Sequence, residues 1–277
     1  MNSLFSGIFR SWTNKIILIN IIMFILTSIL MLFLSESQLI SLFALQPDLF
    51  LQGKNLWTLF TSMFMHANFS HLFFNMFSLF FVGNFVEKLI GKKRFLIFYI
   101  VSGLFAGLFF ALLSGYFGYG FLGEKIFGNP SLAGVGASGA IFSLVGLLAI
   151  LTPRNRVYLI LGPFIALVFS AILGSIISNG ALVTLLNWII TIYFVISIMS
   201  LLSFNPQLQR ISVPVNMPFW ILPIVAIVPV TIISLFIPLP IGNMAHLGGL
   251  IAGLIYGVYL KQKYPRKTRM ISRHFSR

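Results

Sequence analysis

Apolar residues gather in this chain into long runs, which short polar and charged stretches interrupt. An α-helix needs about 20 apolar residues to cross the hydrocarbon core of a bilayer. The first run is too long for the core of a signal peptide and has no convincing cleavage site, so we expect a retained helix. Eight runs predict membrane-spanning helices: 16–35, 69–87, 95–115, 135–152, 157–178, 181–203, 218–237 and 243–260.

The composition excludes a soluble domain. The 277 residues are 58% hydrophobic and only 8% charged, and the mean hydropathy is +1.02. The chain has no cysteine, which excludes disulfides and thiolate metal sites, and we expect no cofactor. The net charge of +14 does not indicate a nucleic-acid partner, because the basic residues fall between and beyond the apolar runs. The expected environment is a lipid bilayer.

The basic residues predict one orientation. With the N-terminus in the cytoplasm, 16 of the 18 lysines and arginines lie on the cytoplasmic side, and only Lys54 and Lys125 lie outside. Cytoplasmic loops of membrane proteins carry such an excess of positive charge. We therefore expect a multi-pass protein of the cell membrane with both termini in the cytoplasm, including a basic tail over 261–277.

Four polar residues are expected at one depth near the outer ends of their helices. They are Ser138, His246, His71 and Asn75, from three different apolar runs. Polar and ionisable groups inside a membrane are costly, so they point to function. Structural polar residues would scatter in depth, whereas these four converge, which favours a single site.

The residue types suit acyl transfer. A serine hydroxyl becomes a nucleophile when a base such as histidine takes its proton. Gly136 and Gly139 flank Ser138 and leave room for a reacting carbonyl, and a serine that begins a helix has a backbone N–H free for an anion. His71 and Asn75 are four residues apart, share a helix face, and can both donate a hydrogen bond to an oxyanion.

The acidic residues favour a dyad over a triad. Only four carboxylate side chains are present: Glu36, Asp48, Glu87 and Glu124. Glu87 is expected at the inner end of its helix, far from Ser138. The other three are expected in external loops, so a Ser138–His246 dyad is favoured while a loop carboxylate stays open.

Small residues predict that the two helices of the dyad pack closely. Gly249, Gly253 and Gly257 recur every fourth residue after His246. A second small strip, Gly139, Ser143 and Gly146, follows Ser138. Such strips let membrane helices approach closely, although they also occur in membrane proteins without catalytic activity.

With these residues in view, the chain resembles the rhomboid family of intramembrane serine proteases. Residues 66–75 carry the family's His-x4-His-x3-Asn spacing, and residues 136–139 match its Gly-x-Ser-Gly. Residues 245–253 are similar to its Ala-His-x-x-Gly-x-x-x-Gly. Each motif alone is weak, but all three occur in order and on the same expected side of the membrane.

The resemblance implies roles for the matched positions. Ser138 would be the nucleophile and His246 the general base, with His71, Asn75 and the Ser138 N–H forming the oxyanion hole. The remaining matches would be supporting residues. These are His66 and Glu87 as structural supports, Phe142 as the aromatic ring packed on the catalytic histidine, and the glycines Gly136, Gly139, Gly249 and Gly253.

The implied fold is an all-α polytopic membrane protein with a rhomboid-like six-helix core and about eight transmembrane helices in total. Two departures stand out: Thr58 follows Trp57 where the family often has arginine, and two extra apolar runs separate Ser138 from His246. The expected organisation has five parts: a cytoplasmic segment (1–15), core helices 1–4 with an embedded external loop (16–156), a two-helix insertion (157–212), core helices 5–6 (213–260) and the basic tail (261–277).

We therefore expect an intramembrane serine endopeptidase that acts on transmembrane protein substrates, with its active site toward the outer side. Two alternatives stay open. One is a catalytically silent rhomboid-like protein that binds membrane clients, although such relatives lack the serine or the histidine. The other is a transporter, which would need further polar groups in the inner halves of its helices, where only Asn187 lies.

Overall fold

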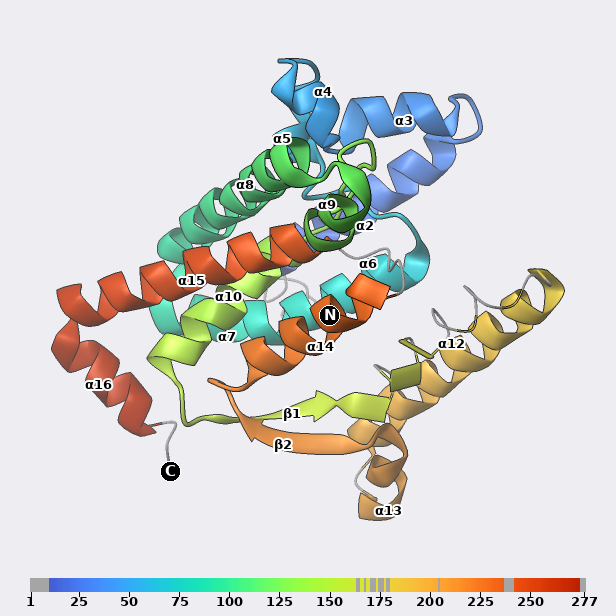
Figure 1. Ribbon diagram of the computed structural model, residues 1–277. Helices are drawn as coiled ribbons and strands as arrows, with labels where there is room; N and C mark the ends of the chain where they lie inside the picture. The colour runs from blue at the N-terminus through green and yellow to red at the C-terminus, as the bar shows by residue number, and fades with distance from the viewer. Residues whose placement is uncertain are drawn as a thin grey trace.

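The computed structural model describes residues 10–162, 165–166, 168–169, 173, 177, 180–203, 205–236 and 242–274. Helices dominate this part of the chain (Figure 1). The N-terminal half contains α2 (Trp12–Leu30), α3 (Glu36–Phe43), α4 (Pro47–Leu51), α5 (Thr58–Thr61), α6 (Phe69–Ser78), the π-helix η1 (Leu79–Gly83), α7 (Asn84–Ile90), α8 (Lys92–Phe117) and α9 (Gly120–Phe127). The C-terminal half contains α10 (Ser138–Leu151), β1 (Arg156–Ile160), α12 (Gly180–Leu202), α13 (Pro206–Gln209), the 3-10 helix η2 (Arg210–Ser212), β2 (Pro214–Pro218), α14 (Leu222–Phe236), α15 (Asn243–Lys263) and α16 (Pro265–His274).

The helices confirm the prediction of an all-α polytopic membrane protein. Five of them are long and apolar enough to cross a membrane: Trp12–Leu30, Phe69–Ile90, Lys92–Phe117, Gly180–Ser197 and Asn243–Lys263. The helices α10 and α14 are shorter and also apolar. Seven of the eight predicted runs thus contain an apolar helix in the described part of the chain.

The remaining predicted run is 157–178. The prediction of a helix there is wrong for its first residues. Residues 157–160 belong to strand β1, which pairs antiparallel with β2 so that Arg156 lies opposite Pro218 and Ile160 opposite Pro214. Valine, tyrosine and isoleucine favour strands, and a short apolar run has no period that separates strand from helix. Most of the remainder of that run lies outside the described residues. The predicted helix over 218–237 begins later, at Leu222, because residue 218 closes β2.

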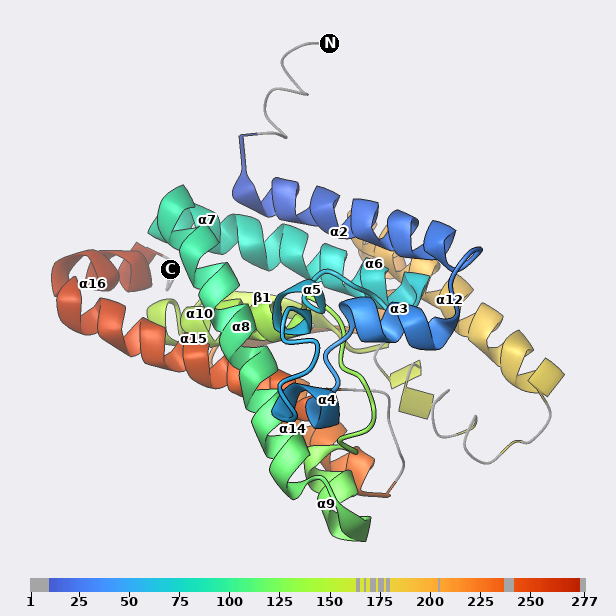
Figure 2. The same ribbon diagram turned by 90° about the horizontal axis from the view of Figure 1, so that it is seen from above.

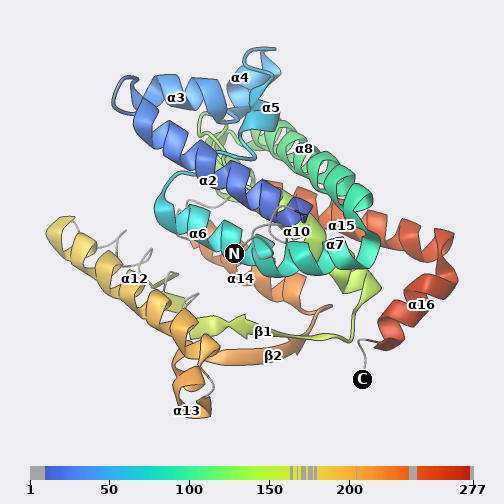
Figure 3. The same cartoon turned by 180° about the vertical axis from the view of Figure 1, so that it is seen from behind.

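The two strands carry the extra part of the chain away from the bundle. Figure 1 and Figure 3 place α12 and α13 at the far end of the β1–β2 sheet, away from α8 and α15. Two aromatic contacts link α12 to α6, because the ring centroid of Phe194 lies 4.0 Å from that of Phe74 and 5.4 Å from that of Phe73. Residues 157–212, predicted as a two-helix insertion, therefore contain strand β1 as well as helix α12.

The helix α10 is the centre of the bundle. Most of its residues are buried, including Leu144, Leu147 and Leu148 with no exposed surface. The surrounding core comes from α2, α6, α7, α8 and α15, and Figure 2 shows α10 among these helices. A short helix buried on all sides is hydrophobic all round, as its sequence is.

Glu87 joins the second membrane span to the start of the first. Its carboxylate accepts hydrogen bonds from the backbone N–H groups of Trp12 and Thr13 at 3.0 and 2.9 Å. The hydroxyls of Ser11 and Thr13 donate to it at 2.7 and 2.8 Å. The first N–H groups of a helix lack intrahelical partners and favour a negative charge, so Glu87 satisfies the start of α2.

The loop between the first two spans is folded against the bundle. It contains α3, α4 and α5, and Leu39 and Leu45 are almost fully buried. Asp48 fastens it to the segment after α8, since it accepts hydrogen bonds from the hydroxyls of Tyr119 and Ser131 at 2.6 and 2.9 Å. Thr58, which stands where the family often has arginine, is buried and donates to the carbonyl of Asn55.

Candidate active site

Ser138 is the first residue of α10, and the turn before it is held by the backbone. Gly136 has a φ of +120°, a conformation that side chains disfavour. Its N–H donates to the carbonyl of Ser62 at 2.8 Å, which ties the turn to the external loop. Because helix α10 begins at Ser138, the N–H of this serine has no intrahelical acceptor.

His246 lies in the first turn of α15 and meets Ser138 directly. Its Nε2 is 2.8 Å from the Ser138 Oγ, a distance typical of a good hydrogen bond. The imidazole stacks on the ring of Phe142, with ring centroids 4.3 Å apart and an interplanar angle of 16°. Phe142 lies one turn after Ser138 on α10, so the same helix that carries the hydroxyl also fixes the plane of the imidazole.

Close helix packing makes this contact possible. A Cβ atom at Gly249 would overlap the carbonyl oxygen of Gly139, and one at Gly253 would overlap the carbonyl oxygen of Ser143. A Cβ atom at Gly146 would lie only 2.6 Å from the carbonyl oxygen of Leu250. Glycines on both helices therefore bring the backbones of α10 and α15 into contact, as the two small strips predicted.

His71 and Asn75 approach the same turn from α6. The Asn68 side chain caps this helix by accepting from the His71 N–H at 2.8 Å, which fixes the orientation of the first turn. A Cβ atom at Gly136 would lie 2.8 Å from the His71 ring, so that ring packs against the glycine turn. The Asn75 Nδ2 donates to the His71 carbonyl at 3.0 Å and keeps a second N–H for another acceptor.

His66 supports His71 from the loop before α6. The two rings make an edge-on contact with centroids 5.1 Å apart, and the His66 Nδ1 lies 3.3 Å from the Phe64 carbonyl oxygen. Burial, and next the neighbouring His71, lower the pKa of His66 to about 4, so its ring is neutral at pH 7. Its buried Nε2 has no hydrogen-bond partner within the described residues.

These side chains share one cavity of about 1180 Å³. The predicted site residues that line it are Ser138, His246, His71, Asn75, His66, Gly136, Gly139 and Phe142. Gly249 and Gly253 lie at the contact between α10 and α15 instead, and Glu87 lies at the start of α2. The structure thus brings eight of the eleven predicted site residues to one cavity. Of the other three, Gly249 and Gly253 pack against α10, and Glu87 caps the start of α2.

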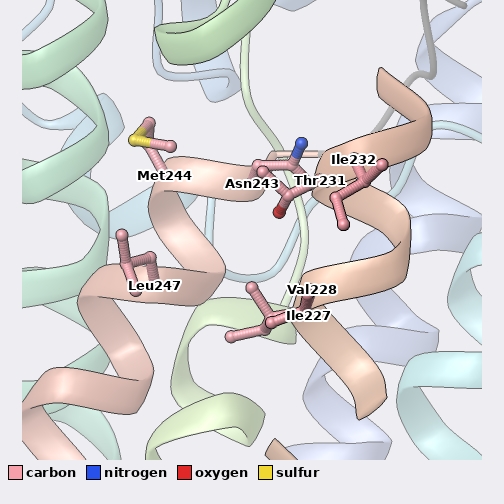
Figure 4. A pocket seen from close by; sticks show the side chains of 7 residues that line it. All are labelled: Ile227, Val228, Thr231, Ile232, Asn243, Met244 and Leu247. Carbon is pink, nitrogen blue, oxygen red and sulfur yellow. The ribbon is translucent and has the colours of Figure 1, made fainter. Parts of the chain in front are cut away.

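A smaller apolar pocket of about 190 Å³ lies beside the cavity, between α14 and α15 (Figure 4). Figure 4 shows Ile227, Val228 and Thr231 of α14 facing Met244 and Leu247 of α15. At its upper end the Asn243 Nδ2 donates to the Ser234 Oγ at 2.9 Å. This hydrogen bond links α14 to α15 within one helical turn of His246.

Sequence reasoning missed several positioning residues. Ser62, which accepts from Gly136, carries no signal in the sequence because its backbone carbonyl makes the contact. Asn68 could have been found, because an asparagine directly before an apolar run is a helix-cap signal. Ser234 could have been suspected as a polar residue within an apolar run.

No carboxylate reaches His246 in the described part of the chain. Asp48 is bonded to Tyr119 and Ser131, and Glu87 is bonded to the start of α2. Residues 10–162 and the other described segments also contain no cluster of three metal-ligating side chains. The chemistry that this arrangement can perform is proton transfer between an imidazole and a hydroxyl beside several N–H donors.

Comparison with known proteins agrees with the motifs. The chain matches the Rhomboid domain over residues 53–192 and 191–263. It is 33% identical to rhomboid protease GluP of Bacillus subtilis over 142 residues, which is 48% of this chain and 25% of GluP. It is 38% identical to rhomboid protease AarA of Providencia stuartii over 92 residues, 32% of this chain and 31% of AarA.

The relatives also include a protein named as inactive. Inactive RHOMBOID-like protein 8 of Arabidopsis thaliana is 36% identical over 61 residues, 22% of this chain and 17% of that protein. In each of these three comparisons the matched region covers less than a third of the relative's own length. Similarity to these relatives therefore does not by itself assign an activity to this chain.

Proposed function

This chain belongs to the rhomboid family, and from that premise we propose that it is an intramembrane serine endopeptidase with Ser138 as nucleophile and His246 as general base. The observation that carries the proposal is the 2.8 Å distance between the Ser138 Oγ and the His246 Nε2. Nucleophile and base must lie within hydrogen-bond reach for the proton transfer to occur. The two residues are separated by 107 others in the sequence, so their meeting is a property of the fold.

Acylation begins when the Ser138 oxygen attacks the carbonyl carbon of the scissile peptide bond. As the C–O bond forms, the hydroxyl proton passes to the Nε2 of His246, and the carbonyl oxygen becomes an oxyanion. The imidazolium then gives this proton to the amide nitrogen, the C–N bond breaks, and the new amine leaves. Such acid–base assistance contributes about 10²–10⁴-fold to the rate.

The oxyanion needs donors already in place. The donors we assign are the Ser138 N–H, the His71 ring and the second Nδ2–H of Asn75. All three residues line the same cavity, and Gly136 gives the His71 ring room to approach. Donors that are fixed before the reaction stabilise the developing charge without reorganisation.

Deacylation needs water inside the membrane boundary. The cavity of about 1180 Å³ has room for water beside the acyl group. His246 takes a proton from this water, the hydroxide attacks the ester carbonyl, and Ser138 leaves with the proton. The free acid is released, and the dyad returns to its starting state.

We assign the catalysis to a dyad. A triad orients its histidine through a buried carboxylate, whereas here the stacked ring of Phe142 holds the imidazole plane. Within the described residues, the side chain of His246 hydrogen-bonds to Ser138 and to no carboxylate. Packing on one face and a hydrogen bond at one edge together leave the ring little freedom.

The substrates we propose are other membrane proteins, cleaved in or near a transmembrane segment close to the outer side. A transmembrane helix uses its carbonyl groups in internal hydrogen bonds, so it must unwind locally before attack. Residues that weaken a helix near the cut, and a small side chain at the cut itself, should therefore favour cleavage. In this proposal the protein lies in the cell membrane with both termini in the cytoplasm, as the distribution of basic residues supports.

The test is cleavage of a purified model transmembrane substrate in uncharged detergent micelles. The wild type should release two fragments, whereas Ser138→Ala and His246→Ala should release none above background. Ser143→Ala is the matched control, because Ser143 lies on the same helix but hydrogen-bonds to Ser102 rather than to His246. Equal cleavage by wild type and Ser138→Ala would overturn the mechanism, and no cleavage by a folded wild type would favour a silent family member.

A further inference from the structure

One end of the helix bundle carries many cations and almost no anions. The helix α8 begins there with Lys92, Lys93 and Arg94, and α15 ends there with Lys261 and Lys263. Figure 1 shows α16 continuing from α15 at this end, opposite α9. The only acidic residue of the chain near this end is Glu87, which already accepts hydrogen bonds from the start of α2. Within the described residues, these cations therefore have no other carboxylate side chain beside them at this end.

Two of the cations converge on the same aromatic ring, that of Tyr264. The Arg94 Nη2 donates to the Tyr264 hydroxyl at 3.1 Å, and its guanidinium lies 4.9 Å from the centre of the Tyr264 ring. Lys263 approaches the same ring, with its Nζ 5.9 Å from the centre, and donates to the Tyr259 hydroxyl at 2.6 Å. Two like charges from α8 and α15 thus share tyrosine partners that cannot neutralise them.

Apolar surface adjoins this cluster on the membrane side. Ile97 lies one turn after Arg94 on α8 and is 53% exposed. Ile255 lies one turn before Tyr259 on α15 and is 63% exposed. Positions three or four apart share a helix face, so an exposed isoleucine lies next to Arg94 on α8 and next to Tyr259, the hydrogen-bond partner of Lys263, on α15. The stacked rings of Phe98 and Tyr256, 4.5 Å apart, hold the two helices together at this level.

We propose that Arg94 and Lys263, with Tyr259 and Tyr264, bind the phosphate of an anionic phospholipid at this end of the bundle. A guanidinium matches two phosphate oxygens at once, and an ammonium adds a point charge. Tyrosine suits the boundary between headgroup and hydrocarbon. The exposed isoleucines below would contact the acyl chains, which is why the ligand is a lipid rather than a free phosphate ion.

The helix α16 extends the same surface. Its Thr268 is buried against the bundle, and the opposite face exposes Arg266, Lys267, Arg269 and Met270. Clusters of basic residues beside a membrane span attract anionic headgroups. A lipid held between Arg94 and Lys263 would join α8 to α15, the helix that carries His246 at its other end. This binding does not depend on catalysis and is independent of the proposed function.

The experiment measures the thermal unfolding midpoint of the full chain in uncharged detergent micelles. Phosphatidylglycerol should raise the midpoint, whereas phosphatidylcholine with the same acyl chains should not. The variant R94Q/K263Q should need on the order of tenfold more phosphatidylglycerol for the same rise. The matched control R154Q/R210Q removes two exposed cations elsewhere and should behave as the wild type does.

Three results would overturn the proposal. If the two double variants respond equally to phosphatidylglycerol, the rise in midpoint depends only on the net charge of the chain and not on Arg94 and Lys263. An equal rise with phosphatidylcholine would remove the need for an anion. An equal rise with inorganic phosphate would assign a free-anion site in place of a lipid. Matching midpoints of R94Q/K263Q and the wild type without lipid show that the variant folds.

Discussion

In the proposed mechanism, Ser138 is a nucleophile whose neighbours prepare its hydroxyl for attack. His246 supplies the acceptor at 2.8 Å, and Phe142 holds that acceptor in plane. Gly136 turns the chain so that the His71 ring can lie beside it. At this scale the proposed activity depends on a few side chains, which are Ser138, His246, Phe142, His71 and Asn75.

Asn75 gives the residue-level prediction. Asn75→Ala removes one proposed oxyanion donor and leaves Ser138 and His246 in place. Loss of one such donor typically costs about 2.7–4 kcal/mol in the transition state, so cleavage should slow by about 10²–10³-fold. The measurement is the initial rate of cleavage at saturating substrate, with the unfolding midpoint as the control for folding. A rate within a factor of three of the wild type would remove Asn75 from the oxyanion hole.

Motif spacing was enough to select the residues that meet at the candidate site. It selected His71 and Asn75 because a four-residue separation fixes a shared helix face. It could not foresee how Glu87 works, since the hydroxyls and N–H groups of residues 11–13 come from a segment about 75 residues away. Such contacts follow from the tertiary fold, which local patterns do not encode.

Among the secondary-structure elements, α10 and α15 determine the geometry of the candidate site, because they carry Ser138 and His246. Their glycines remove the side chains that would otherwise separate the two backbones. Strand β1 is the element that the sequence mispredicted, because Val157 to Ile160 is apolar enough for a helix and too short to reveal a period. The prediction succeeded where helices are long and failed where the chain leaves the bundle.

Gly249→Ala gives the element-level prediction. Its added Cβ would overlap the Gly139 carbonyl oxygen, which is backbone and cannot swing away. Helix α15 must therefore shift, with an expected loss of about 1–3 kcal/mol in the free energy of unfolding. Cleavage should fall sharply as well, because His246 moves away from Ser138.

The control for Gly249→Ala is Gly180→Ala, since a Cβ at Gly180 meets no atom of the described residues within 4 Å. This variant should match or slightly exceed the wild-type stability, because alanine favours a helix more than glycine does. Denaturation in detergent micelles compares the two variants. Equal stability and cleavage for Gly249→Ala and the wild type would contradict the close approach of α10 and α15.

The whole molecule is organised by charge as well as by hydropathy. The cations of α15, of α16 and of the start of α8 gather at one end of the bundle, whereas three of the four acidic residues lie in α3, α4 and α9. This asymmetry is the basis for the proposed orientation in the membrane. It is also the basis for the prediction that the active site lies toward the outer side.

Single cysteines test this orientation cleanly, because the chain has none of its own. Lys54 and Arg210 are both exposed and lie on opposite predicted sides. A membrane-impermeant maleimide added to intact cells should label Lys54→Cys and should leave Arg210→Cys unlabelled until the membrane is permeabilised. The reverse labelling pattern would invert the orientation and place the active site toward the cytoplasm.

The central claim is that Ser138 is the nucleophile that His246 activates. The most direct measurement is mass spectrometry of the folded chain after reaction with a fluorophosphonate, which bonds to activated serines. We expect one adduct, on Ser138, which is absent from Ser138→Ala, strongly reduced in His246→Ala and unchanged in Ser143→Ala. An adduct that persists in Ser138→Ala, or that maps to another serine in the wild type, would contradict the account.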